Sequence, residues 1–178
     1  MKRINEYFGE TPDVKGPSIV NTPVNFYRQE RDWTCSIACV RTVISAFNNN
    51  ISEEQIIKDN NLKIGGQHIE DMKKKRGCFK DLKLESQETR LIKDIQGLYD
   101  LLLDNYIIIC AHAYNLYHYI VCYGYLTTNE RQNPENQYIL FYDPYLDEHK
   151  LINADIFDTM WYDIGTNKYR DYIAVKQD

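Results

Sequence analysis

The chain has 178 residues, which suits one domain with a substantial buried core. Hydrophobic residues make up 43% of the chain and aromatic residues 13%, and this composition excludes an intrinsically disordered protein. The net charge of -5 argues against a protein that binds nucleic acid or an anionic membrane, because those partners require a basic face.

The N-terminal part of the chain predicts an extended segment followed by a helix. Residues 1–23 contain several Pro and Gly residues and are expected to form an extended lead-in to a single domain of residues 24–178. A short strand is expected at residues 25–27. Apolar residues then recur at helical spacing over residues 35–47, which predicts a helix with one face in the core and Cys35 at its exposed first turn.

Further helices and one strand are expected in the middle of the chain. The sequence Ser-Glu-Glu-Gln opens residues 52–59 and is a capping-box signature for a second helix. A third helix is expected at residues 68–75, and a strand at residues 82–85. Apolar side chains at helical spacing predict a fourth helix over residues 91–103.

The second half of the chain is predicted to form a sheet. Strands are expected at residues 106–113, 118–126, 137–142 and 171–176. Helices therefore dominate the first half and strands the second. This segregation predicts an α+β fold, with N-terminal helices packed on a C-terminal antiparallel sheet, rather than a doubly wound one.

Neither a targeting segment nor a disulfide framework is evident. Residues 1–7 lack the apolar stretch of a signal peptide, and no window approaches the roughly 20 apolar residues of a membrane span, so we expect a cytoplasmic protein. The cysteines are odd in number and lack metal-ligand spacing, which argues against structural zinc. Three of them are expected to be small core residues, although Cys39 is close enough to Cys35 for an oxidative pairing: Cys39, Cys110 and Cys122.

Cys35 stands at the predicted start of the first helix, six residues after Gln29. A thiolate at a helix N-terminus is stabilised by the helix dipole and by unpaired backbone N–H groups. A side-chain amide just upstream can bind the oxyanion that forms when the thiolate attacks a carbonyl. The spacing therefore indicates a nucleophile and an oxyanion donor.

His118 and Asp143 supply the groups that such a cysteine needs. His118 begins one apolar run and Asp143 closes the next. A histidine beside Cys35 favours the thiolate and acts as a general base. An aspartate holds the imidazole in the required tautomer and stabilises the imidazolium. The three residues together favour acyl-transfer chemistry.

Each candidate also has a plainer interpretation. Cys35 could be a buried cysteine at a helix start, and Gln29 could be an ordinary loop residue. Asp143 could simply cap the turn that the Asp-Pro sequence opens. His112 is a rival base at the end of an apolar strand, but His118 is preferred because it begins a strand of its own.

These residues carry a family resemblance that covers about residues 25–176. The chain resembles the papain-like superfamily at Gln29, Asp32-Trp33, Cys35, Ala38-Cys39, His118-Tyr119-Ile120-Val121, Gly124 and Asp143-Pro144. Within that superfamily it is similar to the peptidase domains that trim double-glycine leaders in bacteriocin exporters. It is also similar to the eukaryotic guanylyl-cyclase-domain-containing proteins, whose tail resembles residues 161–175 here.

The resemblance implies a papain-like catalytic domain with a role for each matching residue. Gln29 would be the oxyanion donor, Cys35 the nucleophile, His118 the general base and Asp143 the residue that orients the imidazole. One position departs from the pattern, because Ser36 stands where these families usually have glycine. Its backbone N–H can still serve an oxyanion hole, but its side chain is expected to narrow the approach of the substrate.

The predicted function is that of a cysteine hydrolase that cleaves an amide bond, either peptide or isopeptide, without a metal or an organic cofactor. Its expected partner is a peptide or protein substrate, and neither nucleic acid nor a membrane. Three alternatives stay open. They are a catalytically weak peptide-binding pseudoenzyme, a guanylyl cyclase-like activity, and a deamidase or transglutaminase that uses the same acyl-enzyme.

Overall fold

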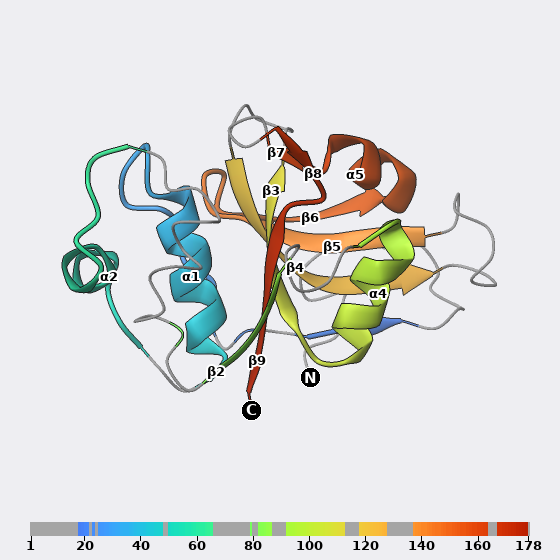
Figure 1. Ribbon diagram of the computed structural model, residues 1–178, viewed down its shortest axis with the longest axis horizontal. Coiled ribbons are helices and arrows are strands. Elements are labelled where there is room, and N and C mark those ends of the chain that lie inside the picture. Colours follow the sequence, from blue (N-terminus) through green and yellow to red (C-terminus); the bar gives the residue numbers. More distant parts are fainter. Residues whose placement is uncertain are drawn as a thin grey trace.

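The fold is an antiparallel sheet with helices on both faces (Figure 1). The computed structural model describes residues 18–21, 23, 25–47, 50–65, 79, 82–86, 92–112, 118–127, 137–163 and 167–177. Two helices, α1 (Cys35–Ser45) and α2 (Glu53–Asp59), lie on one side of the sheet. Two others, α4 (Ile95–Leu103) and α5 (Ala154–Met160), cover the other side.

Within the described residues, the main sheet has seven strands, all paired antiparallel. Its order is β2-β9-β3-β4-β5-β6, and β1 pairs with β4 off this path. The strands of this sheet are β1 (Ile19–Val20), β2 (Leu82–Ser86), β3 (Ile107–His112), β4 (His118–Thr127), β5 (Gln137–Asp143), β6 (Glu148–Asn153) and β9 (Tyr172–Gln177). A separate two-stranded sheet is formed by β7 (Tyr162–Asp163) and β8 (Lys168–Tyr169).

The sheet separates two hydrophobic cores, because successive strand residues point to opposite faces. On the α1 side, Val43 and Ile44 pack with sheet residues such as Val121. On the other side, residues of α4 and α5 such as Leu98 and Phe157 pack against the opposite face. A sheet covered on both faces explains why β3 and β4 are buried along their whole lengths.

Most of the predicted elements are confirmed, and so is the α+β class. Ser52 caps the second helix as expected, since its hydroxyl accepts the Gln55 N–H at 3.1 Å, but the Gln55 side chain donates to Asp59 and does not complete the capping box. The helix predicted from residue 91 begins only at Ile95, because the Asp94 carboxylate caps it by accepting the Gln96 N–H. The third helix, predicted at residues 68–75, lies outside the described residues.

Two local expectations are wrong. Residues 25–27 form no strand, because their backbone N–H groups bond to side chains of α1 instead of a neighbouring strand. The Asn25 N–H donates to the Ser45 hydroxyl and the Tyr27 N–H to the Thr42 hydroxyl, each at 3.1 Å. Cys35 is buried rather than exposed, with 8% of its surface accessible.

Several elements were not predicted, and they complete the sheet and its helical cover. Strand β6 and helix α5 follow β5 directly, so a helix of the second half covers the sheet face opposite α1. Strand β1 was also not predicted, and it joins the same sheet as β2, the strand expected at residues 82–85; both come from the first half of the chain. The helices and strands are therefore less strictly segregated than the sequence suggested.

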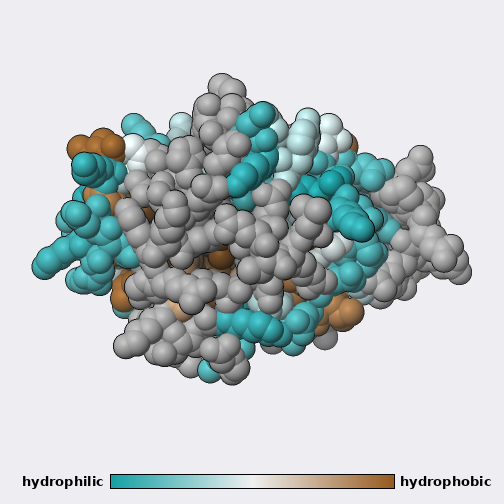
Figure 2. Space-filling view, viewed as in Figure 1, coloured by the Kyte–Doolittle hydropathy of each residue, from teal (hydrophilic) through white to brown (hydrophobic). Residues whose placement is uncertain are grey.

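The described surface is predominantly polar on the face shown in Figure 2, where hydrophobic areas are small and separate. Large hydrophobic side chains that are exposed include Tyr145 at 51% and Leu146 at 38%, side by side on the turn after β5. Within the described residues, no helix combines the length and the apolar character needed to cross a membrane.

Gly124 provides a test of how tightly β4 is packed. The β4–β5 register shifts between Cys122 and Gly124, and a Cβ atom on Gly124 would lie 3.0 Å from Leu140 Cβ and 3.2 Å from the Ile19 carbonyl oxygen. We expect Gly124→Ala to lower the free energy of unfolding by about 1–3 kcal/mol, because the added methyl group overpacks this site. Urea unfolding measures the change. An effect as small as that of Lys93→Ala, at an exposed position, would contradict the predicted packing.

Candidate active site

Cys35 is the first residue of α1, where backbone N–H groups lack intrahelical partners. The N-cap residue is Thr34, and its side chain makes no capping hydrogen bond to the helix. The first intrahelical bond described runs from the Ala38 N–H to the Thr34 carbonyl at 2.9 Å. The Cys35 N–H therefore precedes the hydrogen-bonded ladder, as an oxyanion donor must.

His118 bridges Cys35 and Asp143. It is the first residue of β4, and Asp143 is the last residue of β5, the neighbouring strand. The His118 Nε2 atom lies 2.6 Å from Asp143 Oδ1, and the Cys35 side chain is close enough to the imidazole to raise its pKa. Since Nε2 is occupied by the carboxylate, Nδ1 is the ring nitrogen that is left for the thiol.

The surroundings of His118 favour a protonated imidazole. Burial alone would lower the pKa of His118, but the hydrogen bonds and charges of Asp143 and Cys35 outweigh it and raise the pKa to about 9. Burial would likewise raise the pKa of Asp143. The hydrogen bond and positive charge of His118, with the Leu146 and Tyr145 N–H groups, instead hold it below its usual value. The pair is therefore ionised at neutral pH.

Asp143 also caps the turn that follows β5. Its Oδ1 atom accepts the Tyr145 N–H at 2.9 Å and the Leu146 N–H at 3.2 Å. The plainer interpretation of the Asp-Pro sequence is thus correct, and it coexists with the contact to His118. The turn in addition places the Tyr145 ring edge-on to the imidazole, with 6.1 Å between the ring centroids.

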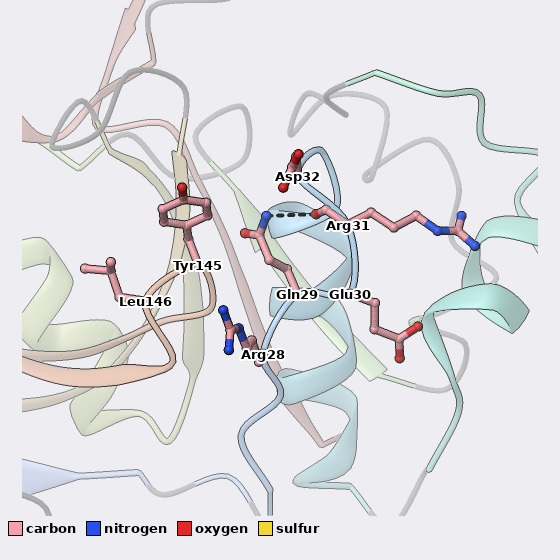
Figure 3. A pocket seen from close by; sticks show the side chains of 7 residues that line it. All are labelled: Arg28, Gln29, Glu30, Arg31, Asp32, Tyr145 and Leu146. Carbon is pink, nitrogen blue, oxygen red and sulfur yellow. Dashed lines mark hydrogen bonds between the residues drawn. The ribbon is translucent and has the colours of Figure 1, made fainter.

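Gln29 lies in the loop that leads into α1, across a cavity from the turn of Tyr145 and Leu146 (Figure 3). The cavity has a volume of about 520 Å³ and is also lined by Arg28, Glu30, Arg31 and Asp32. The Gln29 N–H donates to the Pro144 carbonyl at 3.0 Å, which ties the loop to the turn. Its side-chain Nε2 donates to the Arg31 carbonyl at 2.8 Å, and one of the two amide protons remains for another acceptor.

The other residues singled out in the sequence analysis are buried in the structure. His112 pairs directly with His118 across β3 and β4, and burial lowers its pKa to about 4, so that its imidazole is neutral. Cys39, Cys110 and Cys122 are fully buried free thiols, as expected. The Ser36 side chain is also fully buried, so it adds no exposed group to the approach to Cys35.

Sequence reasoning missed some residues around the site. Tyr145 and Leu146 follow an ordinary Asp-Pro turn, and only the strand pairing shows that this turn faces Gln29. Glu53 is a buried carboxylate, but its sequence context is that of an exposed helix start. No cluster of candidate metal ligands occurs among the residues that the structure describes.

Comparison with known proteins identifies the relatives of this chain. The family model described as the Peptidase C39 family matches residues 23–165. Among curated proteins, none matches the chain.

Two similar solved structures share the fold. The peptidase domain of Streptococcus ComA, a bifunctional ABC transporter of a quorum-sensing pathway, has a TM-score of 0.58 and 15% identity over 85% of this chain and 97% of its own. A double glycine motif protease from an AMS/PCAT transporter, solved with the leader peptide, has a TM-score of 0.52 and 13% identity over 89% of this chain and 94% of its own.

These matches agree with the resemblance to bacteriocin-exporter peptidases. They give no support to the resemblance to guanylyl-cyclase-domain-containing proteins. The family match spans most of the chain and includes Gln29, Cys35, His118 and Asp143. The chain therefore belongs to the Peptidase C39 family, a family of cysteine peptidases.

Proposed function

We propose that this protein hydrolyses a peptide bond with Cys35 as the nucleophile, His118 as the general base, Asp143 as its orienting partner and Gln29 as an oxyanion donor. One observation carries the proposal. The buried His118 imidazole lies 2.6 Å from the Asp143 carboxylate and close enough to Cys35 for both residues to raise its pKa, which stabilises its protonated form. A protonated imidazole beside a thiol favours the thiolate, which is the reactive form of cysteine.

The proposed reaction begins when the Cys35 thiolate attacks the scissile carbonyl carbon. The carbonyl oxygen becomes an oxyanion, which the Gln29 amide and the Cys35 backbone N–H stabilise. The His118 imidazolium then gives its proton to the leaving amine, and an acyl-enzyme remains on Cys35. Finally His118 removes a proton from water, which attacks the thioester and releases the acid.

A peptide substrate is favoured by the shape of the site. The cavity between the residue 28–32 loop and the Tyr145–Leu146 turn is open and adjoins His118 through Tyr145. Exposed apolar side chains on one wall and charged ones on the other suit a polypeptide segment. The related double glycine motif protease was solved in complex with a leader peptide, which supports the same class of substrate.

Cys35→Ala is expected to abolish peptide cleavage, and Gln29→Ala to reduce kcat by about 10²–10³ with little change in KM. Loss of one oxyanion donor has this effect because the donor acts mainly on the transition state. Cleavage of a peptide library, followed by mass spectrometry, supplies the substrate and the rates. Gln55→Ala, at an exposed position of α2, is the matched control. Activity that survives Cys35→Ala would remove Cys35 as the nucleophile.

The pH profile tests the role of His118. Because the proposed active form carries a protonated imidazole, kcat/KM should fall as pH rises through the His118 pKa of about 9. Asp143→Asn removes the negative charge that helps to raise this pKa, so the alkaline limb should move by about one unit or more to lower pH. An alkaline limb at the same pH in both proteins would exclude the Asp143–His118 contact as its cause.

A further inference from the structure

Glu53 is a buried acidic side chain whose position is not explained by the needs of its own helix. It lies in the first turn of α2 and is only 1% exposed. Ser52 already caps this helix, and the neighbouring Glu54 is exposed. Burial raises the pKa of Glu53, and the nearby Thr34 hydroxyl and the Glu30 N–H offset this only in part. A buried carboxylate costs stability unless it is well bonded.

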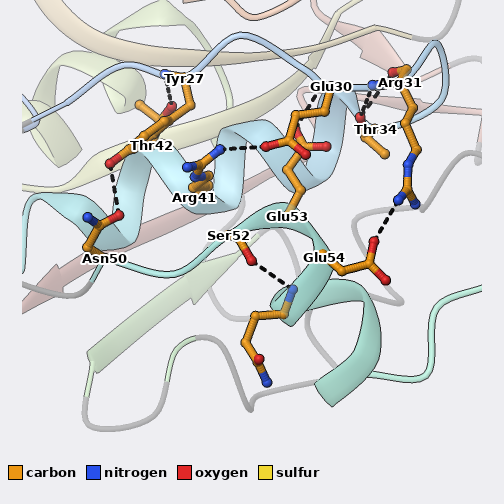
Figure 4. A network of polar contacts seen from close by, with 11 residues as sticks. Tyr27, Glu30, Arg31, Thr34, Arg41, Thr42, Asn50, Ser52, Glu53 and Glu54 are labelled. Atoms are coloured by element: carbon orange, nitrogen blue, oxygen red, sulfur yellow. Dashed lines mark hydrogen bonds and ion pairs between the residues drawn. The ribbon is translucent and has the colours of Figure 1, made fainter.

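The hydrogen bonds of Glu53 lead to the loop that carries Gln29. Figure 4 shows Glu53 extending from α2 toward Glu30 and Thr34. Its Oε1 atom accepts the Glu30 N–H at 3.2 Å. Glu30 directly follows Gln29, at the start of the turn that precedes Cys35. Glu53 therefore holds this end of the turn from a different helix.

Thr34 and Arg31 hold the Gln29 amide within the same loop. The Thr34 hydroxyl oxygen accepts the Arg31 N–H at 3.0 Å, and the Thr34 N–H donates to the Arg31 carbonyl at 3.1 Å. The same carbonyl accepts Nε2 of Gln29 at 2.8 Å. The orientation of the Gln29 amide thus depends on a carbonyl that Thr34 holds in place.

Other charged groups near Glu53 are engaged elsewhere. The Arg41 guanidinium donates to the Glu30 carboxylate at 2.9 Å and also lies 3.9 Å from the centroid of the Tyr27 ring. The Arg31 guanidinium pairs with the exposed Glu54 at 2.6 Å. Among the described contacts, the Glu30 N–H is therefore the hydrogen-bond partner of the Glu53 carboxylate.

We propose that Glu53 is a positioning residue that holds the Gln29 loop through the Glu30 N–H, and with it the Gln29 amide in the orientation required of an oxyanion donor. The expected effect of Glu53 on turnover rests on the proposed function, whereas its expected effect on the conformation of the loop does not. Because Glu53 acts through other residues and touches no reacting atom, its loss should slow the chemical step more than it weakens substrate binding.

Kinetics of Glu53 variants test this role. Glu53→Ala is expected to lower kcat on the order of tenfold with KM nearly unchanged. Glu53→Gln keeps an oxygen that can accept the Glu30 N–H and should recover most of the rate. Glu54→Ala removes the adjacent exposed carboxylate and should leave kcat as in the wild type. Equal losses for Glu53→Ala and Glu54→Ala, or a change confined to KM, would overturn the proposal.

A double-mutant cycle separates positioning from a general structural effect. If Glu53 acts through Gln29, then Glu53→Ala should cause little further loss of kcat in the Gln29→Ala background. Losses that multiply would show that Glu53 acts independently and would overturn the proposal. Should Glu53→Ala fail to fold, Glu53→Asp keeps the charge and draws the carboxylate back from the Glu30 N–H. It should reproduce the kcat loss, and an unchanged kcat would overturn the proposal.

Hydrogen exchange tests the loop without any substrate. Amide exchange at residues 30–34 should become about tenfold faster in Glu53→Ala than in Glu54→Ala, because the Glu30 N–H loses its acceptor. Unchanged exchange would overturn the proposal whatever the kinetics show. Faster exchange in a protein whose wild type cleaves no peptide would instead support the positioning role and contradict the proposed function.

Discussion

The ion pair between His118 and Asp143 is the interaction on which the chemistry of this site depends. Its two side chains come from the adjacent strands β4 and β5, and their atoms lie 2.6 Å apart. Burial would favour the neutral imidazole, but the effects of Asp143 and Cys35 together outweigh it and favour the charged one. His112 pairs with His118 from the neighbouring strand β3. Burial lowers the pKa of His112, so its imidazole is neutral. Two neighbouring histidines of one sheet thus differ in charge because of their surroundings.

The geometry of the candidate site depends on contacts between separate layers of the fold. The sheet supplies His118 and Asp143, helix α1 supplies Cys35, and the loop before α1 supplies Gln29. The bond from the Gln29 N–H to the Pro144 carbonyl joins that loop to the sheet. On the opposite side, Glu53 joins the same loop to α2. The loop is therefore held from two directions, which suits a donor that must be in place before charge develops.

The sequence predicted the elements that follow a strong local pattern. It did not predict the features that depend on contacts between residues far apart in the chain. The helix cap at Ser52, the helix from Cys35 and the run from His118 each follow a short-range rule, and each element forms. The expected strand at residues 25–27 fails because α1 side chains satisfy its backbone, which no local pattern indicates. Glu53 has the sequence context of a solvated helix start, and only tertiary packing buries it. The grouping of Cys35, His118 and Asp143 could be predicted because their order and spacing resemble a known family.

The most direct test of this account is the rate at which iodoacetamide alkylates Cys35 between about pH 5 and pH 9, in the wild type and in His118→Ala. The fully buried Cys39, Cys110 and Cys122 serve as internal controls when the label is located by peptide mass. The account predicts rapid labelling of Cys35 near pH 6 that falls steeply in His118→Ala, because the imidazolium stabilises the thiolate. Slow labelling that rises only near pH 8.5, the range of an ordinary thiol, and that does not change without His118 would contradict it.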